Sequence, residues 1–203
     1  GVIVPSPSYL KAVREWCDDQ GILLIFDEVQ TGLGRLGTLF GYQAFDVEPD
    51  VMTLAKALGG GVPIGAFMAQ EKYCVLEPGD HGSTFGGNAL TCAAAYASAK
   101  YIIENDVPAK AAESGTYLRK QLDGLQSHEP IIAEVRGMGL LLAVEFKEDI
   151  SPMVVAACNE EGLLMNSVRP NAIRMMPPLI VKKEEIDLAI ERFTRGLHRV
   201  LEG

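Results

Sequence analysis

An acid and an amine each follow an apolar segment of this chain, and their types and spacing could support chemistry on one small molecule. Asp27 ends the run GILLIFD at residues 21–27, and Lys56 comes two residues after the segment 51–54. The first run is typical of a fully buried strand, because it is apolar and begins at a glycine. Ligands of α/β proteins bind at the carboxyl ends of neighbouring parallel strands. We therefore expect the Asp27 carboxylate and the Lys56 amine to meet at one sheet edge.

Such a pair matches the needs of pyridoxal 5'-phosphate. This cofactor forms a Schiff base with a lysine, and it needs a carboxylate that keeps its pyridine nitrogen protonated so that the ring accepts the electrons of a broken Cα–H bond. The lysine amine can then carry the proton. Taken alone, each residue has a simpler explanation, since most lysines are merely solvated and a strand-end acid often caps a turn.

Three ordered blocks around these residues resemble the class III aminotransferases, the pyridoxal-phosphate enzymes that include the acetylornithine, ornithine and 4-aminobutyrate types. The blocks are IFDEVQTGLGR at residues 25–35, AKALGGG at 55–61 and HGSTFGGN at 81–88. The resemblance continues through EVRGMG at 134–139 and IRMMPP at 173–178. It therefore covers essentially the whole chain.

The resemblance implies an α/β fold with two parts. Residues 1–104 would be the carboxyl-terminal part of the large domain of a fold-type I pyridoxal-phosphate-dependent transferase, a mainly parallel sheet with helices, and residues 105–203 a small α+β carboxyl-terminal domain. Family members are roughly twice this length, so the chain is expected to be a carboxyl-terminal half that is inactive alone. The implied missing parts are the acid before Gly1, a glycine and serine or threonine loop for the cofactor phosphate, an aromatic ring that stacks on the pyridine, and an upstream arginine.

The resemblance also assigns cofactor roles. Lys56 would form the Schiff base and move the proton, and Asp27 would hold the pyridine nitrogen, which makes these two the catalytic residues. Val29 would pack on a ring face, and Gln30 would hydrogen-bond the ring's 3-oxygen, although a core valine and a loop glutamine are the plainer alternatives. Thr84 resembles the threonine that binds the cofactor phosphate of the partner subunit, which implies a homodimer.

Arg174 resembles the arginine that binds the substrate α-carboxylate through a bidentate fork, with a surface arginine as the alternative. Structural roles are expected for Arg136 and for Glu28, because neighbouring strand residues point to opposite sides and Glu28 cannot share a site with Asp27. The glycines at 59–61 belong to no P-loop pattern, so we expect no nucleotide site.

The activity that the resemblance implies is transfer of an amino group to 2-oxoglutarate in a two-stage cycle. N-acetylornithine is the expected donor, which would place the enzyme in arginine biosynthesis, and ornithine, succinylornithine and 4-aminobutyrate are close alternatives. A pyridoxal-phosphate-dependent aminomutase shares the fold. A noncatalytic folded module or dimerisation module without cofactor is the alternative from another class.

Composition excludes several other functions. The chain has 203 residues, 48% of them hydrophobic, and 27 acidic against 18 basic residues give a net charge of −9. No basic run suits a nucleic-acid surface, and no apolar stretch is long enough to span a membrane. The four cysteines and three histidines show no metal-ligand spacing, so free thiols and a cytoplasmic location are expected.

The periodicity of apolar residues predicts the elements that position these groups. We expect a helix after Ser8 that packs through Leu10, Val13 and Trp16, a strand at 64–69, and an alanine-rich helix at 88–103. A helix with an apolar stripe to residue 125, a hairpin of strands 131–135 and 140–146, and a helix from residue 151 capped by Gly162 follow. Strands at 163–165 and 173–175 precede a last helix, whose stripe is Ile186, Ile190, Phe193, Leu197 and either Val200 or Leu201.

Overall fold

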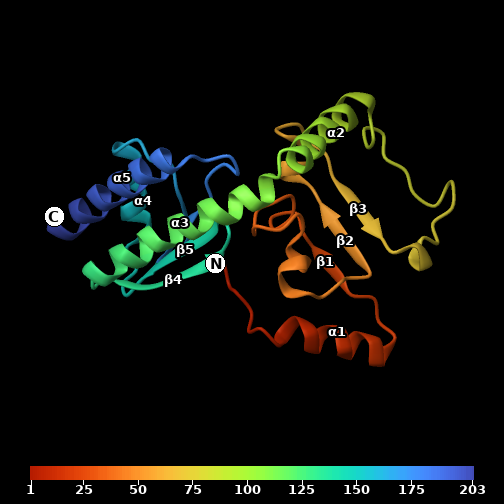
Figure 1. Cartoon of the computed structure of the whole chain (residues 1–203), viewed down its shortest axis with the longest axis horizontal. Coiled ribbons are helices and arrows are strands. Elements are labelled where there is room, and N and C mark those ends of the chain that lie inside the picture. The colour runs from red at the N-terminus through yellow and green to blue at the C-terminus, as the bar shows by residue number, and fades with distance from the viewer. The chain divides into compact units, whose positions relative to one another are not determined.

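The computed structural model describes residues 1–203, and the chain divides into two compact units (Figure 1). One unit is Pro5–Ala109, and the other combines Gly1–Val4 with Lys110–Gly203. The boundary lies inside helix α3 (Val107–His128) rather than between residues 104 and 105. The first four residues join the second unit because the Arg136 side chain donates hydrogen bonds to the carbonyls of Gly1 and Val2.

A three-stranded sheet of order β1-β2-β3 forms the centre of the first unit. Strands β1 (Ile25–Asp27) and β2 (Val51–Leu54) are parallel, and β3 (Ala66–Ala69) runs antiparallel to β2. In the register, Asp27 lies opposite Thr53. The predicted parallel pairing of the first two strands is thus confirmed, and it brings their carboxyl ends to one edge.

Helix α1 (Tyr9–Gln20) packs through Leu10, Val13 and Cys17 on a cluster that includes Leu24, Val47 and Phe26. The prediction that Trp16 shares this face is wrong, because its side chain is 57% exposed. Both spacings fit a period of 3.6 residues, and Cys17, four residues after Val13, takes the buried position.

The expectation of a fully buried first strand is also wrong. β1 is an edge strand, and its side chains alternate, so that Phe26 packs on the α1 cluster while Ile25 remains exposed. Ile22 and Leu23, which precede the strand, are exposed as well. An apolar run is typical of strands covered on both faces, but in this unit only the face with Phe26 is covered.

Short helices follow the strands of the first unit. The 3-10 turns are η1 (Gly41–Phe45), η2 (Lys56–Gly59) and η3 (Glu71–Tyr73). The predicted alanine-rich helix is α2 (Ala89–Glu104). Its N-cap is Asn88, whose side chain accepts a hydrogen bond from the Thr91 N–H at 3.0 Å. Helix α2 contacts η2, where the Ser98 hydroxyl donates to the Ala57 carbonyl at 2.9 Å.

The second unit contains an antiparallel sheet of order β4-β5-β7-β6. Its strands are β4 (Ile132–Met138), β5 (Leu141–Phe146), β6 (Asn166–Arg169) and β7 (Ala172–Met175). The predicted hairpin is confirmed as β4–β5, whereas the strand expected at 163–165 is wrong. The Leu163 N–H closes the end of the preceding helix by donating to the Cys158 carbonyl at 2.8 Å, so the strand begins later.

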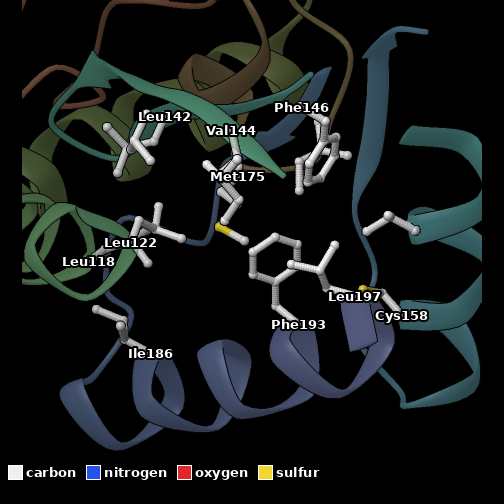
Figure 2. Packing of buried hydrophobic residues seen from close by; sticks show 14 of the residues in the cluster. Leu118, Leu122, Leu142, Val144, Phe146, Cys158, Met175, Ile186, Phe193 and Leu197 are labelled. Atoms are coloured by element: carbon white, nitrogen blue, oxygen red, sulfur yellow. The ribbon is translucent and has the colours of Figure 1, made fainter. Parts of the chain in front are cut away.

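Helices α3, α4 (Ser151–Glu160) and α5 (Lys183–Glu202) cover one face of this sheet. Figure 2 shows how their side chains meet those of β5 and β7 in one core. Gly162 follows α4 in a left-handed conformation, as predicted. On α5, Ile186, Phe193 and Leu197 are buried and Val200 packs on the core, while Leu201 is exposed. None of the helices combines the length and apolar character needed to cross a bilayer.

Candidate active site

Asp27 ends β1 with its carboxylate fixed through one oxygen. Its Oδ1 atom accepts hydrogen bonds from the Val29 backbone N–H at 3.0 Å and from the Thr53 hydroxyl at 3.1 Å. Its Oδ2 atom has no partner in the chain, and the residue is exposed. The sequence interpretation missed Thr53, although its place opposite Asp27 in a parallel pair follows from the two strand ends. The anchored carboxylate can therefore accept a further hydrogen bond from a ligand.

Lys56 begins η2 two residues after the end of β2, and the residue is exposed. Its φ is 48°, which is a left-handed conformation that residues with a side chain rarely adopt. Such a conformation costs of order 1–3 kcal/mol. Val2, Leu33, Asp46 and Asp106 also have a positive φ, so the conformation alone does not mark a functional site. The structure thus places Asp27 at the carboxyl end of β1 and Lys56 just after the carboxyl end of the neighbouring parallel strand β2.

Glu28 has a different environment from its neighbour Asp27, as its expected structural role requires. It is only 3% exposed and accepts hydrogen bonds from the Gly41 N–H at 2.8 Å, the Tyr42 N–H at 2.7 Å and the Thr31 hydroxyl at 2.5 Å. These contacts satisfy the buried carboxylate without another charge. They also hold the segment after β1 against the start of η1.

The other predicted cofactor residues lie in loops of the same unit. Val29 and Gln30 are half-buried and follow Asp27 directly. Thr84 is exposed in the loop before α2. The roles assigned to these three residues remain predictions.

Arg174 lies in the second unit, on β7, and is half-buried. Its Nε atom is buried without a hydrogen-bond partner, and its Nη2 atom donates one long hydrogen bond, 3.3 Å, to the Asn166 side chain. No carboxylate of the chain pairs with it. The residue also lines a cavity of about 360 Å³ together with Met165, Met176 and Pro177. Arg174 therefore retains donors that a ligand carboxylate can use.

Arg136 differs from Arg174 because its donors are occupied. It is 9% exposed, and it forms ion pairs with Glu134 at 2.9 Å and Glu145 at 2.5 Å besides its two bonds to backbone carbonyls. This arrangement agrees with the structural role expected from the sequence.

Comparison with known proteins identifies the family. The model of the class-III aminotransferases matches residues 1–197. The chain belongs to this family. An acetylornithine aminotransferase of Caldanaerobacter subterraneus subsp. tengcongensis is 49% identical over 192 residues, which are 94% of this chain and 49% of that protein. Ornithine aminotransferase 2 of Staphylococcus aureus is 48% identical over 194 residues, 95% of this chain and 48% of that protein.

Solved structures of class-III aminotransferases show the same fold. The ornithine aminotransferase of Toxoplasma gondii matches with a TM-score of 0.93 and 40% identity, over 100% of this chain and 49% of that one. The acetylornithine aminotransferase of Elizabethkingia anophelis matches with a TM-score of 0.91 and 36% identity, over 98% of this chain and 54% of that one. The structure is thus a partial α/β fold of the pyridoxal-phosphate-dependent aminotransferases. It spans about half the length of the curated relatives it matches.

Class-III aminotransferases use pyridoxal 5'-phosphate, and the residues of the first unit fit this cofactor. Asp27 keeps one carboxylate oxygen without a partner, as a hydrogen bond from a protonated pyridine nitrogen requires. Lys56 offers an exposed amine on a strained backbone that follows the neighbouring strand. The chemistry of these two side chains therefore agrees with that of the cofactor.

Proposed function

We propose that the protein to which this chain belongs is a pyridoxal-phosphate-dependent transaminase that moves an amino group from N-acetylornithine, or a related ω-amino acid, to 2-oxoglutarate. The observation that carries the proposal is that Asp27 ends one strand and Lys56 follows the end of the adjacent parallel strand in a class-III aminotransferase chain. The names of its relatives, acetylornithine and ornithine aminotransferases, favour these donors.

Lys56 and Asp27 would have different roles in the reaction. When bound, pyridoxal phosphate supplies the electron sink that stabilises the carbanion of the substrate. The Nζ atom of Lys56 would take the proton from the substrate carbon that bears the reacting amino group, which is Cδ in N-acetylornithine, and would return it one step later. The Asp27 carboxylate is oriented by Thr53 and the Val29 N–H. It would keep the pyridine nitrogen of the cofactor protonated.

The remaining residues would orient the ligands. Val29 and Gln30 would contact the cofactor ring, and Thr84, in its exposed loop, would bind the phosphate in the partner subunit of a homodimer. Arg174 would bind the α-carboxylate of 2-oxoglutarate, because its buried Nε–H and guanidinium lack an internal anion. N-acetylornithine as donor would place the enzyme in arginine biosynthesis, and the four unpaired cysteines favour a cytoplasmic location.

Two alternatives make different predictions. An aminomutase would isomerise an amino substrate without a 2-oxo acid, and a noncatalytic module would fold without taking up the cofactor. The module deserves a test because the chain spans about half of its relatives.

The test is an assay of glutamate formation from 2-oxoglutarate with each of four donors, N-acetylornithine, ornithine, succinylornithine and 4-aminobutyrate. The chain is assayed with pyridoxal phosphate, alone and after mixing with the amino-terminal half of the Caldanaerobacter relative. We expect turnover only in the mixture, and Lys56→Ala should abolish it. A stable complex that takes up the cofactor but forms no glutamate from any donor would contradict the transaminase, and a complex without cofactor would favour the module.

A further inference from the structure

Arg136 and Arg174 lie in one row across the sheet of the second unit. The register pairs Arg136 with Ala143 on β5, and Ala143 in turn with Arg174 on β7. Residues that lie opposite each other in a sheet share a face, so both arginines project from the same face with Ala143 between them. Ala143 is small and fully buried, and it adds no polar group to the row.

Two carboxylates occupy the next row on this face. Glu134 on β4 lies directly opposite Glu145 on β5, two residues along each strand from Arg136 and Ala143. Glu145 is therefore the diagonal neighbour of Arg136 on one side and, through its register partner Ala172, of Arg174 on the other. Diagonal neighbours of an antiparallel pair lie about 7–8 Å apart, within reach of long side chains. Glu145 is thus placed diagonally between two arginines of this face, and the Asn171 side chain and the charge of Arg169 act on it as well.

The structure shows Glu145 paired with Arg136. The Nη1 atom of Arg136 donates to Glu145 at 2.5 Å and to Glu134 at 2.9 Å, and so it bridges two acids that would otherwise repel each other. The hydrogen bond from Arg136 is the main cause that holds the pKa of Glu145 below its ordinary value. The Nε and Nη2 atoms of Arg136 donate to the Val2 and Gly1 carbonyls at 3.0 and 2.9 Å, which fixes the guanidinium in this orientation.

Arg174 consequently has no internal anion, although a carboxylate lies on its own sheet face. An internal carboxylate within reach acts at an effective concentration that reaches the millimolar range or more, so it competes strongly with a free substrate. Whether Arg174 can bind a substrate carboxylate therefore depends on whether another residue pairs with Glu145.

We propose that Arg136 is a positioning residue for substrate binding, because by holding Glu145 it keeps Arg174 available for the carboxylate of the substrate. This inference rests on the role proposed for Arg174 above. It gives the ion pair a function beyond the stability of the sheet, and it names Glu145 as the competing anion.

The test observes Arg174 directly by the nuclear magnetic resonance of arginine Nε–H groups in the chain, titrated with 2-oxoglutarate at constant ionic strength. Arg119, which pairs with Asp123 in the middle of α3, reports nonspecific effects of the anion. The variants are Arg136→Met, Arg136→Met with Glu145→Gln, and Glu145→Gln alone. Arg136→Lys keeps a cation but cannot reproduce the fork, and it serves as the milder variant where the methionine variant does not fold. Backbone spectra of β5 and β7 establish folding before each titration.

In the wild type, we expect the Arg174 signal to respond to 2-oxoglutarate and the Arg119 signal to stay constant. Arg136→Met should raise the midpoint of the Arg174 titration at least tenfold, and Arg136→Lys should raise it less. Adding Glu145→Gln should restore the midpoint, and Glu145→Gln alone should leave it unchanged. An unchanged midpoint in both Arg136 variants would overturn the inference, and so would a loss that Glu145→Gln fails to restore. No response of Arg174 in the wild type would instead contradict the carboxylate role in the proposed function, and the inference would fall with it.

Discussion

The backbone N–H of Gly41 donates a hydrogen bond of 2.8 Å to the carboxylate of Glu28, which lies 13 positions earlier in the chain. A Cβ atom at residue 41 would lie 2.7 Å from the Glu28 Oε2 atom, so any other residue would displace the Glu28 carboxylate from this position. The contact ties the long loop after β1 to the end of the strand that carries Asp27. Glu28 thus helps to position Asp27, but it takes no part in the chemistry proposed for Asp27.

Replacing Glu28 should therefore destabilise the fold. In Glu28→Gln the amide group presents an N–H₂ to at least one of the backbone donors at Gly41 and Tyr42, which leaves a buried group unsatisfied. We expect a loss of about 1.5–3 kcal/mol in the free energy of unfolding, measured in urea. Glu48→Gln, at an exposed position, should change it by less than about 0.5 kcal/mol. Equal stability of the two variants would show that the Glu28 contacts contribute little.

Asp50 should make stability depend on acid pH. Burial acts to raise its pKa, but the Leu24 N–H and the Arg14 guanidinium, each 2.8 Å from its Oδ2 atom, outweigh burial and hold the pKa below its ordinary value. A lowered folded-state pKa contributes stability above the unfolded-state value of about 4, and this contribution is lost as the pH falls through the folded-state value. Asp50→Asn should therefore unfold more easily at pH 7, with a difference that shrinks below pH ~4.

Asp19→Asn is the matched control because Asp19 is exposed on α1. Urea unfolding of both variants at several pH values between neutrality and the acid limit measures the effect. A difference between Asp50→Asn and the wild type that stays constant over the whole range would refute the assigned origin of the pKa shift.

The cysteines should fall into two classes of reactivity. Burial, with a smaller contribution from the charge of Glu161, raises the pKa of Cys158 to about 11, and Cys17 is also buried. Cys74 and Cys92 are exposed. At pH 8, a maleimide should label Cys74 and Cys92 quickly and the other two only after unfolding, because the thiolate is the nucleophile. Peptide mapping after a short reaction checks this, and early label on Cys158 would contradict it.

Local sequence patterns predicted most elements of this fold but not which faces are covered. The stripe on α5 and the left-handed Gly162 after α4 depend on neighbouring residues, and both were predicted from the sequence. The exposure of Trp16 and Ile25 depends instead on what packs against α1 and β1. Periodicity shows which residues share a face, but it carries no information about whether another element lies against it.

The same limit applies to the candidate site. Asp27 and Lys56 could be placed from the sequence because each follows a strand, and parallel strands end at one edge. The pairing of Arg136 with Glu145 could not be predicted from the sequence. It depends on the register of β4 with β5 and on which neighbouring arginine binds Glu145. Register between strands is a tertiary property that the pattern of one segment does not encode.

Asp27 should matter more for turnover than for retention of the cofactor. In the cofactor-loaded enzyme, Asp27→Ala removes the charge that keeps the pyridine nitrogen protonated, while the phosphate contacts remain. We expect kcat to fall by at least a hundredfold and the dissociation constant of the cofactor to rise much less. Thr53→Val, which removes one anchor of the Asp27 carboxylate, should show a smaller effect in the same direction. Near-normal turnover of Asp27→Ala would exclude the role.

The most direct test of the proposed function is the site at which pyridoxal phosphate becomes attached. The cofactor is added to the chain, fixed by borohydride and located by peptide mapping. Lys11, Lys72 and Lys100 are exposed as well, so exposure alone would distribute the label among them. We predict that the label lies on Lys56, and that Lys56→Arg removes it without labelling the others more strongly. Label found mainly on Lys11, Lys72 or Lys100 would contradict the account.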